Sequence, residues 1–241
     1  MNAWVHLTPA AVREEGLRGR PVVVLDVLRA STSIITAVAS GARGVIPADS
    51  LEAATEISTR LGTDDVLLAG ERDARRVEGC DLGNSPGEFT PERVGGRRVV
   101  LATTNGTRAI VRARAACPLM VGGYVNAGRI VGALEDREDA VIVCAGSGGA
   151  FALEDAGCAG YLLERLRKER EREVLPMNDG AWVALELGRR APKSPVRLLR
   201  QAAHGRYLIE AGFEEDLERC GDVDSQPVLP VLRDHMIVAS E

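Results

Sequence analysis

The sequence is poor in aromatic residues and carries no strong charge of one sign. Its 241 residues include only two Trp, three Tyr and three Phe, and 30 Lys and Arg stand against 35 Asp and Glu for a net charge of −5. The two signs are mixed along the chain, so we expect no binding to nucleic acid through a basic surface. Hydrophobic residues make up 45% of the chain, which is enough for a folded globular protein with a proper core.

Cysteines are few, and long apolar runs are missing. The five cysteines are odd in number, widely spaced and without a C-x-x-C pair, so neither a disulfide framework nor a zinc ribbon is predicted. This usage fits a reducing cytoplasm best. The first residues, MNAWVHLTPAAVREE, do not resemble a signal peptide, and uncharged stretches such as residues 30–42 fall well short of about 20 apolar residues. We therefore expect a cytoplasmic protein with no membrane partner.

Several common catalytic motifs are also absent. The chain has no G-x-x-x-x-G-K-[ST] and no G-x-S-x-G, and no two of its three histidines have metal-ligand spacing. The AGSGG segment lacks a lysine and fits G-x-G-x-x-G incompletely. Cys144 at a predicted strand end has the surroundings of a small buried thiol. Serine and cysteine hydrolase chemistry are therefore disfavoured.

Short aliphatic runs alternate with amphipathic segments, which is typical of β-α units around a mainly parallel sheet. The predicted strands are residues 22–25, 44–47, 66–69, 98–102, 119–122 and 140–144. Several are continuously apolar, as expected for strands covered on both faces. We predict a three-layer α/β/α fold with a mainly parallel or mixed sheet. It forms one unit over residues 1–241, with two similar lobes of about 1–115 and 116–241 as a further option.

Other segments have readable structural signals. Residues 51–61 predict a helix that begins with a capping-box-like pair of Asp49 and Glu52 and ends at Gly62. Residues 70–93 are too polar and too rich in Gly and Pro for a regular element, and a loop of that length is usually functional or disordered. The charge run at 164–173 predicts a solvated helix face. Beyond about residue 154 we expect mostly helix, with a new helix starting at Ser194 and Pro195.

Three predicted strands are followed by similar polar turns. The turns read DVLRASTS after residue 25, TTNGTR after residue 102 and GSGG after residue 145. Each contains small hydroxyl, amide or glycine residues before an apolar helix. Because open parallel sheets bind ligands at the carboxyl ends of their strands, these turns are the predicted site.

The first turn offers a carboxylate, a guanidinium and helix-capping hydroxyls. Asp26, Arg29, Ser31 and Thr32 together make a plausible corner for phosphate and Mg²⁺. A purely structural interpretation is equally compatible, in which Asp26 pairs with Arg29 and Ser31 caps a helix. The second turn suits an oxyanion, although an ordinary polar turn at Asn105-Gly106 explains it too.

The long loop and the third turn supply further candidates. The loop combines acids, which are hard oxygen ligands, with arginines that suit phosphate. Gly146 lets the backbone approach a ligand, with a tight packing turn as the alternative. Glu154 and Asp155 at a predicted helix start either favour the helix dipole or bind a cation.

Taken in order, LDVLRASTS, AGERDARRVEGCDLGNSP, TTNGTRA, VCAG and the pair Glu154-Asp155 resemble the 2-phosphosulfolactate phosphatase family of coenzyme M biosynthesis. The resemblance is strong over about residues 22–155 and looser through HGRYL and EEDLERC. It implies an α/β enzyme that uses Mg²⁺ to hydrolyse a small anionic phosphomonoester, 2-phosphosulfolactate, to sulfolactate and phosphate.

The resemblance and the turn chemistry together give the predicted site. The predicted catalytic residues are Asp26, Arg29, Glu71, Arg72 and Asp81. The predicted substrate-binding residues are Ser31, Thr32, Asn84, Ser85, Thr103, Thr104, Asn105, Gly106, Thr107, Arg108 and Gly146. The predicted Mg²⁺ ligands are Asp26, Glu71, Asp81 and Asp155.

Alternatives remain open at this point. Asp26 either holds Mg²⁺ or attacks phosphorus directly. The substrate is 2-phosphosulfolactate or another 2-phospho-hydroxyacid. A non-catalytic binder of anionic metabolites is the alternative of another class, but Asp26, Glu71 and Asp81 would repel its ligand without a metal. A homodimer is compatible with the sequence.

Overall fold

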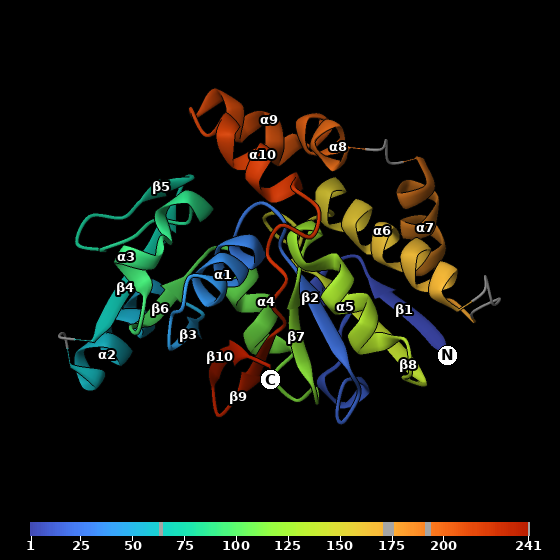
Figure 1. Cartoon of the computed structure of the whole chain (residues 1–241), viewed down its shortest axis with the longest axis horizontal. Helices are drawn as coiled ribbons and strands as arrows, with labels where there is room; N and C mark the ends of the chain where they lie inside the picture. Colours follow the sequence, from blue (N-terminus) through green and yellow to red (C-terminus); the bar gives the residue numbers. More distant parts are fainter. Residues whose placement is uncertain (63–64, 171–175, 191–193, 241) are drawn as a thin grey trace.

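The computed structural model describes residues 1–62, 65–170, 176–190 and 194–240. Within them the chain forms a three-layer α/β/α structure around one mixed sheet (Figure 1). The strands are β1 (Asn2–His6), β2 (Val22–Leu25), β3 (Gly44–Ala48), β4 (Val66–Arg72), β5 (Arg75–Arg76), β6 (Arg98–Ala102), β7 (Leu119–Gly122), β8 (Asp139–Cys144), β9 (Pro230–Arg233) and β10 (Met236–Ala239). The α-helices are α1 (Ala30–Ala39), α2 (Leu51–Leu61), α3 (Pro91–Val94), α4 (Gly106–Arg112), α5 (Ala127–Leu134), α6 (Leu153–Glu169), α7 (Asp179–Arg190), α8 (Pro195–Gln201), α9 (Ala203–Glu210) and α10 (Glu214–Gly221). Short 3₁₀ turns are η1 (Pro9–Ala11), η2 (Glu14–Gly16), η3 (Pro86–Glu88) and η4 (Tyr124–Asn126).

The sheet consists of two parallel groups joined by a C-terminal hairpin. The strand order is β1-β8-β2-β7-β9-β10-β3-β6-β4-β5. Strands β1, β8, β2 and β7 are parallel to one another, and so are β3, β6 and β4. The antiparallel hairpin β9–β10 pairs with β7 on one side and β3 on the other. The last residues of the chain therefore complete the middle of the sheet.

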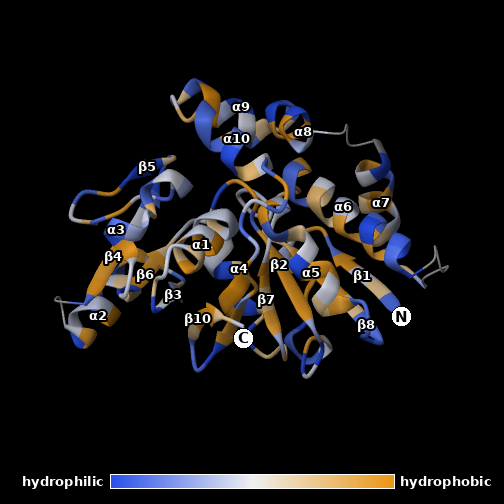
Figure 2. Ribbon diagram, viewed as in Figure 1, coloured by the Kyte–Doolittle hydropathy of each residue, from blue (hydrophilic) through white to orange (hydrophobic). Residues whose placement is uncertain are grey.

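Apolar side chains fill both faces of the sheet. On one face the strand residues Leu25 and Ile142 pack in a core with α5, α6 and α7, and on the other Val24 and Val143 pack with α1 and α4. A smaller cluster places α2 against β3, β4 and β6. Figure 2 shows the strands as the most hydrophobic part of the chain, with polar residues on the outer sides of the helices. This burial on both faces explains why the strands are continuously apolar.

The six predicted strands are confirmed, with β3, β4 and β8 slightly longer than expected. The prediction that the chain beyond residue 154 is mostly helical holds for α6 to α10 but misses β9 and β10. Their turn, Asp234-His235, has positive φ at both residues, without the Gly that usually marks such a turn. The strands before residue 115 do not pair separately from those after it, because β1 and β2 share a parallel group with β7 and β8.

Two local predictions need correction. Helix α2 is capped by Ser50, whose hydroxyl accepts from the Ala53 N–H at 3.2 Å, and not by a box of Asp49 and Glu52. Residues 70–93 are not free of regular structure. Strand β4 runs on to Arg72 and turns back into β5, because positive φ angles at Asp73 and Ala74 close a two-residue hairpin. The predicted helix start at Ser194 and Pro195 is confirmed as the beginning of α8.

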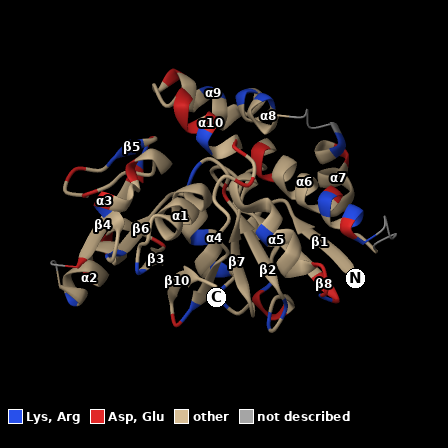
Figure 3. Ribbon diagram, viewed as in Figure 1, with Lys and Arg blue, Asp and Glu red and all other residues tan. Residues whose placement is uncertain are grey.

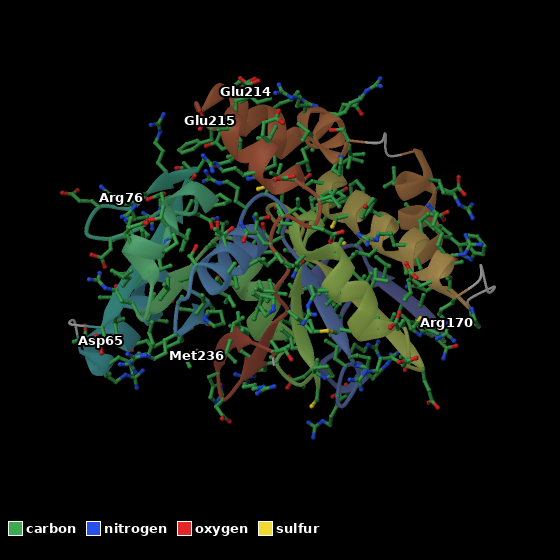
Figure 4. The ribbon with its side chains drawn as sticks, viewed as in Figure 1. Asp65, Arg76, Arg170, Glu214, Glu215 and Met236 are labelled. Atoms are coloured by element: carbon green, nitrogen blue, oxygen red, sulfur yellow. The ribbon has the colours of Figure 1, made fainter. Side chains whose placement is uncertain are left out.

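Helices α8, α9 and α10 form a group that we call the cap, which lies over one end of the sheet in Figure 1. The cap packs on α6 through α8, and on η3 and η4 through α10. Glu214 and Glu215 at the start of α10 point outward to solvent (Figure 4). The next residue, Asp216, is buried. In the described part of the chain, no helix combines the length and apolarity needed to span a bilayer.

Candidate active site

Three adjoining recesses lie at the carboxyl ends of the strands. The central one has a volume of about 170 Å³ and is lined by Asp26, Arg29, Glu71, Asn84 and the turn at residues 103–105. A second, of about 350 Å³, shares Glu71, Thr103 and Thr104 with it and adds Arg72 and Arg108. The third, of about 900 Å³, shares Thr104 and Asn105. The site therefore lies where ligands bind in open α/β sheets.

Asp26 is the buried carboxylate of the central recess. It follows β2 and is 6% exposed. Its Oδ1 accepts from the Ala30 N–H at 3.2 Å, and its own N–H donates to Ser31 Oγ at 2.8 Å. Burial and then the nearby Glu154 and Glu71 carboxylates raise the pKa of Asp26 to about 7, against the opposing effect of the Ala30 N–H. Because burial disfavours the charged form of this carboxylate, a cation bound beside it would be stabilising.

Arg29 is held from three sides and does not pair with Asp26. Its Nη1 donates to Asp216 Oδ2 and its Nη2 to the Ala74 carbonyl oxygen, both at 2.7 Å. The guanidinium also lies 4.6 Å from the ring centroid of Phe213. Because Arg29 is 2% exposed and still lines the recess, it supplies a fixed positive charge at the recess wall.

The hydroxyls of the first turn are structural in this conformation. Thr32 Oγ1 donates to the Val27 carbonyl oxygen at 3.0 Å, and Ser31 Oγ accepts from the Asp26 backbone. Neither residue lines any of the three recesses. They fix the backbone that carries Asp26. Ser31 does not cap the helix as the structural interpretation had it, because the N-cap of α1 is Arg29 and its side chain caps none of the described backbone N–H groups.

The TTNGTR turn divides into lining and supporting residues. Thr103, Thr104 and Asn105 line the central recess. The Thr107 side chain is buried, accepts from the Thr103 N–H at 3.1 Å and thereby closes the turn. Gly106 is required by packing, because a Cβ there would lie 2.6 Å from Asp26 Oδ2. The turn of β6 therefore sits directly against the turn of β2.

Asn84 has the one feature that points most directly to a ligand. It is 3% exposed and lines the central recess, yet among the described residues its Oδ1 has no hydrogen-bond partner. Its backbone carbonyl oxygen accepts from Ser33 Oγ at 2.7 Å, which ties the residue to α1. A buried amide oxygen without a partner is costly, so its environment is complete only with a donor or a cation in the recess.

Asp155 joins two strand ends and is committed to the backbone. Its Oδ1 accepts from the Val27 N–H at 2.9 Å and its Oδ2 from the Gly146 N–H at 3.0 Å. Burial, with the neighbouring Asp26 and Glu154 carboxylates, raises the pKa of Asp155 well above its usual value. Gly146 contacts this carboxylate and lines none of the three recesses. Figure 3 shows the acids at the start of α6, close to the ends of β2 and β8.

Some predicted site residues lie outside the central recess. Asp81 is exposed, and its Oδ2 accepts from the Leu68 N–H at 2.8 Å, which ties the loop to β4. Ser85 donates to Asp216 Oδ1 at 2.6 Å. Arg72 and Arg108 line the second recess. Arg108 Nε also donates to the Asp49 carbonyl oxygen at 3.1 Å. The structure thus does not bring Asp81 together with Asp26.

The cap contributes residues that the sequence did not single out. His204 and Tyr207 of α9 line the central recess, and Asp216 and Phe213 hold Arg29. The segments HGRYL and EEDLERC contain three of these residues and were the only sequence signal for them. Ser147 and Gly148 of the third turn also line the recess, in place of Gly146.

The residues present fit a magnesium ion that is shared with a substrate. Within the described ranges, no three His, Cys, Asp or Glu side chains are grouped so that they could hold a metal by themselves. Mg²⁺ commonly uses only one or two carboxylates together with phosphate oxygens and water. Asp26, Glu71 and the unpartnered Asn84 Oδ1 line one recess and match that donor set.

Fold and site define an α/β protein with an acidic, hydroxyl-lined recess at the carboxyl edge of a mixed sheet. The family model described as 2-phosphosulpholactate phosphatase matches residues 6–235, and the chain belongs to this family. The chain is 40% identical over 241 residues to a probable 2-phosphosulfolactate phosphatase of Symbiobacterium thermophilum, covering 98% of this chain and 100% of that protein. A protein of the same name from Thermotoga petrophila is 36% identical over 222 residues, which cover 92% and 93% of the two chains.

Proposed function

We propose that this protein is an Mg²⁺-dependent phosphomonoesterase that hydrolyses 2-phosphosulfolactate to sulfolactate and phosphate. The observation that carries the proposal is the central recess, where Asp26, Glu71 and the unpartnered Asn84 Oδ1 face a turn rich in hydroxyls. Membership of the family supports the same reaction. A binder of anions alone has no use for three carboxylates, Asp26, Glu71 and Asp73, in its pocket, since they repel the ligand.

In this proposal Asp26 and Glu71 hold Mg²⁺ together with Asn84 Oδ1. When bound, the ion supplies positive charge to the phosphate oxygens during hydrolysis. In the same proposal the hydroxyls of Thr103 and Thr104 and the amide of Asn105, which line the recess, contact the phosphate. Arg29 keeps a fixed positive charge beside it, because Asp216, Ala74 and Phe213 prevent the guanidinium from moving.

Two routes of attack on phosphorus differ in the role of Asp26. In the route we propose, water attacks and Asp26 is a metal ligand. In the competing route the Asp26 carboxylate attacks and forms an acyl phosphate. The stereochemistry at phosphorus separates them, measured with a substrate whose phosphoryl group is made chiral with oxygen isotopes and sulfur. Inversion supports a single attack by water, whereas retention, the result of two displacements through an acyl phosphate, contradicts it.

The function itself is tested by phosphate release from a panel of phosphomonoesters. The panel contains 2-phosphosulfolactate, other 2-phospho-hydroxyacids and simple alkyl phosphates, each assayed with Mg²⁺ and with EDTA. We expect release that is greatest for 2-phosphosulfolactate and lost in EDTA. A preference for another 2-phospho-hydroxyacid would change the substrate only. No release from any compound would overturn the enzymatic function in favour of anion binding.

We further propose that the protein acts in the cytoplasm, in coenzyme M biosynthesis, and without nucleic acid. The free cysteines and the balanced charge support the first and last of these. A homodimer is part of the proposal, and light scattering of the purified protein tests it. A scattering mass equal to the chain's 25.7 kDa would contradict the dimer.

A further inference from the structure

His204 faces the central recess from the cap. It lies in the first turn of α9, and Tyr207 follows one turn later on the same side. The two rings stack with centroids 5.8 Å apart and an interplanar angle of 26°. Across the described part of the chain, neither ring nitrogen of His204 makes a hydrogen bond or an ion pair. A polar ring that lines a pocket without a partner is available to a ligand.

The recess contains charges of both signs. Asp26, Glu71 and Asp73 supply negative charge from the strand ends and the β4–β5 turn, whereas Arg29 supplies a positive charge that acts on both Asp26 and His204. Burial and the Arg29 charge lower the pKa of His204, so the imidazole is neutral near pH 7 and keeps one N–H to donate. The cap therefore offers an N–H donor near the fixed cation of Arg29, which in the proposed function also lies beside the phosphate.

A phosphomonoester with its phosphate at the sheet edge must extend its carbon chain away from Asp26 and Glu71. His204 and Tyr207 line the recess from α9 of the cap, an element separate from those that carry Asp26 and Glu71. Resting on the function proposed above, we infer that His204 donates a ring N–H hydrogen bond to the acidic group on the substrate's carbon chain. Helix α9 thereby selects phosphomonoesters that carry a second anion, whether carboxylate or sulfonate.

The unpartnered ring nitrogen of His204 also explains how the site would select among substrates. A pocket built to hydrogen-bond a substrate group rejects analogues that lack the group, because its buried polar atoms then stay unpaired. The alternative is that His204 only packs on Tyr207. His204→Phe distinguishes the two roles, since it keeps a ring for the stack and removes the donor, while His204→Gln restores an N–H on a side chain of similar reach.

The experiment compares kcat/KM of the wild type and both variants on three phosphomonoesters, with Mg²⁺ present. They are 2-phosphosulfolactate, 2-phospholactate, which has only the carboxylate, and 2-phosphoethanesulfonate, which has only the sulfonate. Inhibition by inorganic phosphate is measured as the control, because phosphate lacks the substrate's carbon chain and its second anion. For His204→Phe we expect about a tenfold to hundredfold loss on each substrate that carries the recognised anion. Inhibition by phosphate should be unchanged, and His204→Gln should recover part of the loss.

The pattern of losses decides the outcome. A loss confined to the two sulfonate substrates identifies the sulfonate as the partner, and one confined to the two carboxylate substrates identifies the carboxylate. Equal weakening of all three substrates and of phosphate inhibition, or no effect, would overturn the inference while leaving the proposed function standing. A wild type that hydrolyses none of the three would overturn the proposed function and the inference with it.

Discussion

The buried pair of Arg29 and Asp216 is predicted to determine both stability and the shape of the site. The side chains are only 1% and 5% exposed and 2.7 Å apart, and Asp216 Oδ1 also accepts from Ser85. Asp216→Asn keeps the shape of the side chain, but the Arg29 charge loses its only counterion among the described salt bridges. Removing one partner of a buried pair costs about 3–5 kcal/mol, because the other charge remains buried and uncompensated.

That loss is large against a total stability of about 5–15 kcal/mol for a domain. For a chain of this size it corresponds to a melting temperature lower by roughly 6–20 °C. Urea unfolding followed by circular dichroism measures the change, and phosphate release measures the effect on the site. The surface variant Arg200→Gln is the matched control. It breaks exposed ion pairs with Glu214 and Glu218 on the same cap, and we expect almost no change.

A double replacement separates stability from function. Arg29→Met with Asp216→Leu removes both charges together, and apolar replacement of a buried pair is often neutral or stabilising. We expect its urea midpoint to recover most of the loss in Asp216→Asn, whereas its activity stays low because the positive wall of the recess is gone. A wild-type midpoint for Asp216→Asn itself would refute the argument that this carboxylate offsets the Arg29 charge.

Three further predictions concern the strand-end turns. Asp26→Asn should lower kcat by about a hundredfold or more, the scale of losing one preorganised group at a transition state, and it should weaken Mg²⁺ activation in a titration. In EDTA the free energy of unfolding should fall as pH rises from about 4 to 7. The folded pKa of Asp26, about 7, exceeds the ordinary aspartate value of 3.8, so the folded state binds more protons over that interval. The contribution of Asp26 to the fall is a few kcal/mol at about 1.4 kcal/mol per pH unit, and Asp26→Asn should reduce the fall, while the raised pKa of Asp155 maintains the remainder. A profile for Asp26→Asn as steep as that of the wild type would contradict this reasoning. Gly106→Ala should destabilise the protein by about 1–3 kcal/mol and reduce activity, because its Cβ would meet Asp26. The control Gly132→Ala, on the open side of α5, should not destabilise the protein. Equal urea midpoints for the two variants would show that Gly106 tolerates a side chain.

The fold was predictable where strands are apolar on both faces. The six runs stand out because water is excluded from each side of the sheet. β1 was not predicted because it is an edge strand of only five residues, in which one of the alternating exposed positions is the apolar Trp4. β9 and β10 were missed because Pro230 and a turn without glycine hide a hairpin that tertiary pairing stabilises.

The site was predictable in its chain-local parts. Strand-end turns can be recognised in the sequence because polar residues follow an apolar strand. On this basis Asp26 and residues 103–105 were predicted to lie in one site, and they line the same recess. The partners that arrive from far along the chain could not be read in the same way. Asp216 reaches Arg29 across 187 residues of sequence, and nothing local in its acidic helix marks it as the buried member.

The hairpin in the middle of the sheet has a consequence for synthesis of the chain. Ribosomes release the N-terminal strands first. On one edge, however, β7 and β3 stay unpaired until residues 230–239 have emerged to form β9 and β10. Until then two inner strand edges stay open, and open edges invite pairing with other chains. Translation arrest or a nonsense codon shortly before residue 230 should therefore yield an aggregating product, even though every residue that lines the central recess would already have been made.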